Sequence, residues 1–144
     1  MPNLRIILIE PKEAGNVGAT ARVMKNFGFR ELWIVGEHPP LQPSAGWWAS
    51  GADDVVTSAR FAPTLHAAIA DTQLAIATTS ARGRTTPVDL SPSDLSETFA
   101  ALGESETLAL VFGSWAGSAR LFGWGISCTI WCLWIAWRAS FIVR

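Results

Sequence analysis

The residues that point most directly to chemistry lie in the stretch Glu13–Gly28, which reads EAGNVGATARVMKNFG. Gly15 and Gly18 stand between an apolar run and a helical pattern. Glycine there lets a backbone come close to a ligand and leaves the first helical N–H groups open to an anion. Asn16 is able to cap this helix, and Arg22 follows about a turn and a half later. By residue type alone, Asn16 and Arg22 fit either a ligand-binding site or an ordinary helix start with a solvated arginine.

A second polar segment, TTSARGR at 78–84, follows another apolar run. Arg82 and Arg84 are expected on an exposed loop. Guanidinium groups there suit contacts to phosphates, which position RNA without reading its sequence. Two solvated charges that aid solubility are the alternative interpretation.

The residue types that usually bind metals are assigned no site. Cys128 and Cys132 lie four residues apart with no histidine nearby to complete a metal set. His38 and His66 have no acidic or cysteine partner in a motif. We therefore predict no metal and interpret the two thiols as incidental.

The elements that must position these residues are indicated by apolar runs and by helical spacing. Runs rich in Ile, Leu and Val that stop at a small or polar residue are typical of buried strands, and Gly28 is a natural helix stop. The expected strands are Leu4–Glu10, Glu31–Gly36, Leu74–Thr78 and Leu108–Gly113, and the expected helices span Val17–Phe27, Leu65–Ile69 and Leu95–Leu102. Residues 37–50, with three prolines, are expected as a surface loop that leads to a short helix near Gly51–Val56.

Alternating strands and helices predict an α/β fold: a mainly parallel sheet with helices on both faces. In such sheets, sites form beyond the carboxyl ends of the strands. The residues after Glu10, Thr78 and Gly113 are therefore where chemistry is expected.

Length and charge limit the possible functions. A chain of 144 residues has room for one domain. With 11 basic and 12 acidic residues the net charge is −1, so any nucleic-acid contact must be local. The start lacks a secretory signal pattern, which makes a cytoplasmic location the default expectation.

Several ordered segments together resemble a known family. They are N-V-G-A-x-A-R followed by Phe-Gly (16–28), ELWIVG (31–36), SGADDV (50–55), TTSARGR (78–84) and LVFG (110–113). In type and spacing they resemble the signatures of the SpoU (TrmH-like) branch of the SPOUT, or α/β-knot, RNA methyltransferases. The resemblance covers residues 1–113 and is nearest to members that methylate cytidine or uridine riboses of tRNA.

This resemblance implies a function and a site. It implies a homodimer that transfers a methyl group from S-adenosyl-L-methionine to a ribose 2′-oxygen in a tRNA anticodon loop. By carry-over, Asn16 and Arg22 belong to the catalytic corner, Thr79, Ser80 and Ala81 to the methionine-side wall of the cofactor pocket, and Gly113 to the start of the second signature motif. Because a guanidinium is almost always protonated, Arg22 is expected to orient the hydroxyl and stabilise negative charge, with a substrate phosphate available for the proton.

The chain departs from the family pattern after Gly113. Residues 114–144 hold five of the eight tryptophans and no acid, and they lack the second and third signature motifs. Three explanations are open: a membrane-spanning helix over Leu121–Trp137, a divergent ending, or a misread frame. We favour a misread frame, because suitable codons for Ser114–Ala119, read one base back, encode Glu-Leu-Gly-Gly-Leu-Ser, which is the missing second motif.

One domain followed by a tail is therefore expected. Residues 1–113 are the methyltransferase part, and 114–144 are an aberrant apolar tail that does not form the knot. The resulting prediction is an RNA methyltransferase whose present chain is inactive. The alternative is a non-catalytic RNA-binding remnant or a membrane-tethered α/β domain, although a membrane is the less favoured partner.

Overall fold

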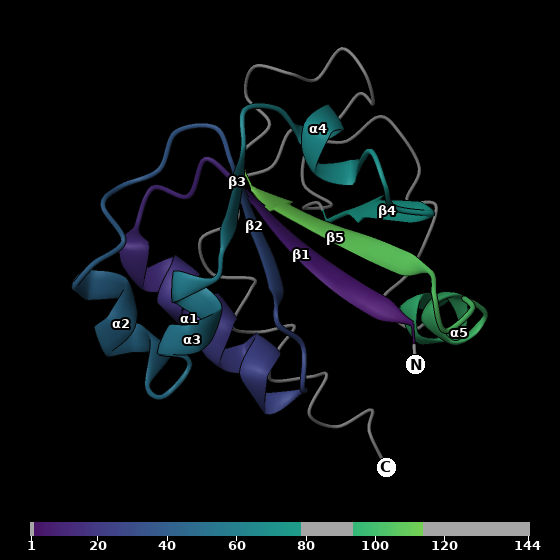
Figure 1. Cartoon of the computed structure of the whole chain (residues 1–144), viewed down its shortest axis with the longest axis horizontal. Helices are drawn as coiled ribbons and strands as arrows, with labels where there is room; N and C mark the ends of the chain where they lie inside the picture. The colour runs from purple at the N-terminus through teal and green to yellow at the C-terminus, as the bar shows by residue number, and fades with distance from the viewer. Residues whose placement is uncertain (1, 79–93, 114–144) are drawn as a thin grey trace.

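The computed structural model describes residues 2–78 and 94–113. Its strands are β1 (Asn3–Ile9), β2 (Glu31–Val35), β3 (Arg60–Ala62), β4 (Leu74–Ala77) and β5 (Thr107–Gly113). Its helices are α1 (Ala14–Asn26), α2 (Ser44–Ala49), α3 (Asp53–Thr57), α4 (Leu65–Ile69) and α5 (Asp94–Ala100). The strands and helices alternate along the chain as predicted (Figure 1).

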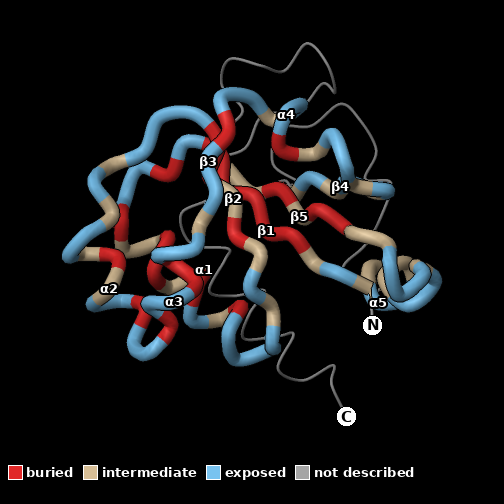
Figure 2. Tube along the Cα trace, viewed as in Figure 1, coloured by how far each residue is buried: buried red, intermediate tan, exposed pale blue. Residues whose placement is uncertain are grey.

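The strands form a five-stranded parallel sheet in the order β3-β2-β1-β5-β4. Strand β1 is central, and its residues Arg5–Ile9 are all buried (Figure 2). A strand covered on both faces reads as a continuous apolar run, which explains why β1 could be predicted from composition. The predicted parallel sheet is confirmed.

Helices cover both faces of the sheet, because successive side chains of a strand point to opposite sides. On one face, Ile6 and Leu8 pack with Val17 and Met24 of α1, and residues of α2 and α3 complete this cluster. On the other face, Ile7 and other alternate strand residues pack with Ala68, Leu65 and Ile69 of α4. Figure 1 shows α1, α2 and α3 together on one side of the sheet and α4 on the other.

The expected loop over 37–50 is wrong in its second half, where α2 forms. Ala45 and Ala49 are fully buried against α1. A Cβ added to Gly18 of α1 would lie 2.1 Å from the carbonyl oxygen of Ala45 and 2.9 Å from the amide nitrogen of Ala49. The two helix backbones thus touch directly, and this tertiary contact stabilises a helix too short to stand alone.

Strand β3 was also not predicted. It has three residues, and Phe61 and Arg60 in it are exposed. It forms because its backbone pairs with the edge of β2, with Ala62 opposite Val35. A segment this short gives no periodic signal in the sequence.

Among the described residues, the core holds one charged side chain, Arg5, at 3% exposure. Its Nη1 donates to the carbonyl oxygen of Ala68 at 2.7 Å, and its Nε donates to Glu31 Oε1 at 3.0 Å. The guanidinium carbon also lies 4.7 Å from the centre of the Trp33 ring. Arg5 therefore joins β1 to β2 and to the end of α4, and its polar atoms are paired as burial requires.

Candidate active site at the carboxyl edge of the sheet

The ends of β4 and β5 are locked together at the carboxyl edge of the sheet. Ala77 lies opposite Val111, and Ile9 of β1 lies opposite Gly113. The backbone N–H and the hydroxyl of Thr78 both donate to the carbonyl oxygen of Val111, at 2.9 and 3.1 Å. Two segments predicted to flank the cofactor, after Thr78 and after Gly113, therefore start from neighbouring strand ends.

Gly113 is a glycine for a reason internal to the fold. Its φ of 148° is one that other residues rarely adopt. A Cβ there would lie 2.5 Å from the carbonyl oxygen and 2.8 Å from the Cβ of Ile9. The chain can leave β5 this close to β1 only without a side chain, whether or not a ligand lies beside it.

The first helix begins earlier than expected, which changes the position of Asn16. Helix α1 starts at Ala14 with Glu13 at its N-cap, and no side chain makes a capping hydrogen bond there. Asn16 lies in the first turn and is half-buried; its carbonyl oxygen accepts from Thr20 Oγ1 at 2.8 Å. The interpretation of Asn16 as the cap is therefore wrong, and its side chain extends from the helix body.

Both glycines of the motif lie inside α1 and not in the turn before it. Gly18 contacts the α2 backbone, as described above, and a Cβ on Gly15 would lie 3.1 Å from the indole of Trp48. The motif's glycine spacing thus serves helix packing. An anion-binding turn, which the sequence also allowed, does not explain Gly18.

Arg22 is exposed on α1. Helix geometry places it about 9 Å along the axis from Asn16 and about 120° away around it. Among the residues that the structure describes, its side chain has no hydrogen bond or ion pair. Asn16 and Arg22 therefore do not share a helix face, so a common ligand would have to span the two positions. Their catalytic roles stay predictions.

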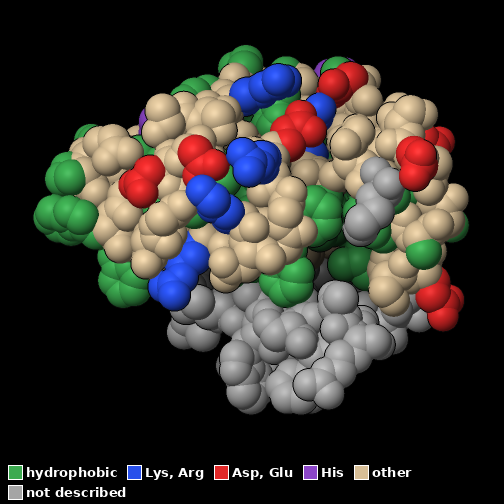
Figure 3. Space-filling model, turned by 60° about the horizontal axis from the view of Figure 1, so that its bottom comes forward, with side chains coloured by type: hydrophobic (Ala, Val, Ile, Leu, Met, Phe, Trp, Pro, Cys, Tyr) green, Lys and Arg blue, Asp and Glu red, His purple; other side chains and the backbone are tan. Residues whose placement is uncertain are grey.

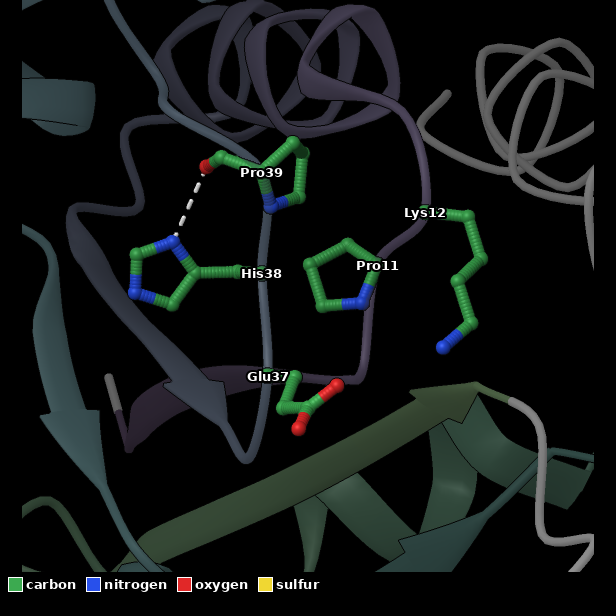
Figure 4. Close-up of a pocket in the computed structure, with 5 residues that line it drawn as sticks. All are labelled: Pro11, Lys12, Glu37, His38 and Pro39. Carbon is green, nitrogen blue, oxygen red and sulfur yellow. Dashed lines mark hydrogen bonds between the residues drawn. The ribbon is translucent and has the colours of Figure 1, made fainter.

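A shallow polar pocket lies beside the ends of β1 and β2 (Figure 4). Its lining residues come from the two loops that follow these strands: Pro11, Lys12, Glu37, His38 and Pro39. His38 Nδ1 lies 3.0 Å from the carbonyl oxygen of Pro39, a distance at which a protonated Nδ1 donates a hydrogen bond to that oxygen. No motif marked His38; its place just after a strand end was the signal available.

The SGADDV segment has a structural role at the other end of α1. Lys25 Nζ donates to the Gly51 carbonyl oxygen at 2.8 Å and to Asp54 Oδ1 at 2.7 Å. The hydrogen bond from Lys25 lowers the pKa of the exposed Asp54 carboxyl, with a smaller effect of Arg30. These contacts hold α3 against α1, which carries the predicted catalytic residues.

Several predicted positions lie outside the described residues. They are Thr79, Ser80, Ala81, Arg82 and Arg84 in one segment, and Cys128, Cys132 and the whole 114–144 tail in the other. Within the described ranges, no helix has the length and apolar character needed to cross a membrane, and no cluster of metal ligands occurs.

Comparison with known proteins identifies similar sequences and folds. The model of the SpoU rRNA Methylase family matches residues 3–115. The chain is 39% identical over 114 residues to a tRNA (cytidine/uridine-2′-O-)-methyltransferase TrmJ of Klebsiella pneumoniae, covering 78% of this chain and 46% of that protein. It is 38% identical over 113 residues to a tRNA (cytidine-2′-O-)-methyltransferase TrmJ of Methanocaldococcus jannaschii, covering 76% and 48%.

A solved structure shows the same fold. The crystal structure of TrmJ from Z. mobilis ZM4 matches with a TM-score of 0.69 and 29% identity, over 97% of this chain and 68% of that one. This chain spans about half the length of the two curated relatives described above.

Proposed function

This chain belongs to the SpoU rRNA Methylase family, and from that premise we propose that its site at the carboxyl edge of the sheet is built for 2′-O-methylation of tRNA. The methylated nucleotide would be a cytidine or uridine, in the anticodon loop, as the family resemblance implies. The proposal includes tRNA as partner, a homodimer as the active assembly and a cytoplasmic location.

One observation carries the proposal furthest: the double hydrogen bond from Thr78 to Val111. It joins the ends of β4 and β5 where the segment 79–81 begins on one strand and the second signature position, Gly113, ends the other. Parallel sheets bind ligands at such carboxyl ends. Residues far apart in the sequence are thereby brought to one edge.

The proposed cofactor is S-adenosyl-L-methionine, which would supply a methyl group already activated on a sulfonium. The described residues fit a cofactor placed at the β4 and β5 ends, because Thr78 and Gly113 set the starts of both predicted walls. Thr79, Ser80 and Ala81 would line its methionine side. The protein then has mainly to align a ribose oxygen with the methyl group and to manage one proton.

Arg22 is proposed to act on the ribose hydroxyl. A charged guanidinium orients an oxygen and stabilises the negative charge that grows on it during methyl transfer. A phosphate of the RNA is the proposed proton acceptor, because a guanidinium is almost always protonated and makes a poor base. Asn16, half-buried one and a half turns away, would hold a different part of the bound nucleotide.

We propose that this particular chain has two parts, residues 1–113 and residues 114–144. The second part stands in place of the motifs that complete the cofactor pocket in the family. A frame change near codon 114 is the proposed origin. The present chain would then transfer no methyl groups, while a chain whose frame is restored would.

The test is a transfer assay with radiolabelled S-adenosyl-L-methionine and unmodified tRNA transcripts. The frame-restored protein should label tRNA on a ribose 2′-oxygen, so that the neighbouring phosphodiester bond resists alkaline hydrolysis. The present chain should not label tRNA. Label on the base, or no label with either protein, would contradict the proposal. Sequencing the gene around codons 113–120 tests the frame independently.

A further inference from the structure

Two adjacent tryptophans on α2 are the most exposed large apolar side chains in the described part of the molecule. Trp47 is 76% exposed and Trp48 is 63% exposed, whereas Ala45 and Ala49 of the same helix are fully buried. Figure 3 shows apolar side chains gathered at the end of the molecule where α2 lies in Figure 1. Neighbouring exposed indoles on one short helix are typical of a binding surface.

The helix that carries the pair is held firmly in place. α2 is fixed to α1 by the direct backbone contact between Gly18 and Ala45, and the Trp48 ring lies beside Gly15. Indoles presented on packed helices lose little conformational freedom when a ligand stacks on them, which favours tight stacking. Gly15 directly precedes Asn16, so the surface adjoins the predicted catalytic corner.

Among the described residues, one cation on the α2 side of α1 has no ion-pair partner. Arg22 is one helical turn from Gly18 and two from Gly15, so it lies along the α2 side of α1. Lys25 follows it on the same side, where its ammonium reaches Gly51 after α2. Asp54 is paired with Lys25 and Arg30, and the Asp53 carboxylate lies beside Gly46 of α2. In the part of the chain that the structure describes, Arg22 has no carboxylate partner.

We propose that Trp47 and Trp48 form a stacking platform for unpaired RNA bases next to the nucleotide that is methylated, whose ribose Arg22 would contact. The platform rests on the proposed function for its substrate class. Single-stranded RNA is recognised by stacking of splayed bases on aromatic rings, and a duplex leaves no base free to stack. The unpaired Arg22 favours RNA, which carries phosphates, over an apolar protein partner.

The experiment measures RNA binding by the full chain with fluorescence anisotropy. The probes are a labelled single-stranded oligouridine and its duplex with oligoadenine, and methyl transfer is recorded separately. Trp47→Ala with Trp48→Ala should weaken binding of the single strand by about 5- to 150-fold per stacked base. The pair of Trp→Phe changes should keep most of the affinity, because the ring faces remain.

Two internal comparisons make the test specific. The salt dependence of binding should be unchanged in the tryptophan variants, because stacking neutralises no phosphate. Phe61→Ala is the matched control, since Phe61 is also an exposed aromatic residue, at 55%, but lies on edge strand β3 against His38. It should bind like the parent chain.

Several other outcomes overturn the platform. Equal binding by the double alanine variant and the parent, equal loss in Phe61→Ala, or no binding of single strands by the parent would do so. A change in the sedimentation mass of the double alanine variant with unchanged RNA affinity would assign the tryptophans to a second copy of the chain instead. Single-strand binding that needs the tryptophans, without methyl transfer by the frame-restored chain, would keep the platform and refute the proposed reaction.

Discussion

Asp71 accepts hydrogen bonds from the buried guanidinium of Arg5 with both carboxylate oxygens. Arg5 Nη1 lies 2.6 Å from Oδ1 and Arg5 Nη2 lies 3.0 Å from Oδ2. The geometry is the bidentate one in which arginine pairs most strongly. Asp71 follows α4, whereas Arg5 is in the central strand, so the pair fastens one helical layer to the sheet.

Replacing Asp71 with Asn should lower the free energy of unfolding at pH 7 by about 1–3 kcal/mol, because the buried Arg5 charge loses one of its two charged partners and keeps Glu31. The loss is smaller than for a fully buried pair, since Asp71 is 68% exposed. Urea unfolding followed by circular dichroism measures it. Glu37→Gln, which removes an exposed carboxylate elsewhere, should unfold like the parent.

The same pair predicts a pH dependence. The hydrogen bond from Arg5 lowers the pKa of Asp71 from 3.8 to about 2. A carboxyl with a lowered folded-state pKa stabilises the fold above its unfolded pKa and loses that contribution as the pH falls. The difference in unfolding free energy between the parent and Asp71→Asn should therefore be constant above pH 5 and shrink between about pH 4 and pH 2. A difference that stays constant down to pH 2 would contradict the assignment.

Gly18→Ala should destabilise the fold even though alanine favours a helix by about 1 kcal/mol. The new Cβ would meet the α2 backbone at 2.1 Å, and overpacking costs about 1–3 kcal/mol or more. Thermal unfolding measures the change. Gly15→Ala is the paired comparison, because its Cβ meets only the Trp48 ring at 3.1 Å, and that exposed ring can move. Equal effects of the two changes would argue against a backbone clash at Gly18.

Arg22→Ala in the frame-restored protein should remove most methyl transfer and leave cofactor affinity nearly unchanged. The reason is that the proposed contact of Arg22 is to the ribose oxygen and not to the cofactor. Initial rates with labelled cofactor and calorimetric titration separate the two quantities. The control is Arg60→Ala, because Arg60 is another exposed arginine, which lies on β3 over the Trp33 ring. This variant should retain the parent rate. An unchanged rate in Arg22→Ala would contradict the proposed role.

The present chain should bind S-adenosyl-L-methionine far more weakly than the frame-restored protein. A pocket that lacks one wall leaves more of a small ligand in water and gives up much of the affinity that enclosure provides. Calorimetric titration of both proteins under one set of conditions measures the difference. Comparable micromolar binding by both would show that residues 114–144 complete the pocket.

The sequence by itself determined the elements whose signal is local. Strands β1, β2, β4 and β5 could be placed from their apolar runs, and α1, α4 and α5 from helical spacing. Burial on both faces leaves a continuous apolar run in a strand, and burial of one face leaves a period in a helix. The family also followed from the sequence, since several motifs in order are more specific than any one. For the candidate site, the sequence predicted which residues take part but not how they lie relative to one another.

Only the tertiary structure decided what lies next to what. The sheet order brings Thr78 beside Val111, and the α1–α2 contact explains Gly18 as a packing residue. Strand β3 exists only because β2 offers it an edge, and Arg5 could be buried only because partners arrive from distant segments. The free energy of each such contact depends on residues far apart in the chain, so a local sequence pattern does not predict it.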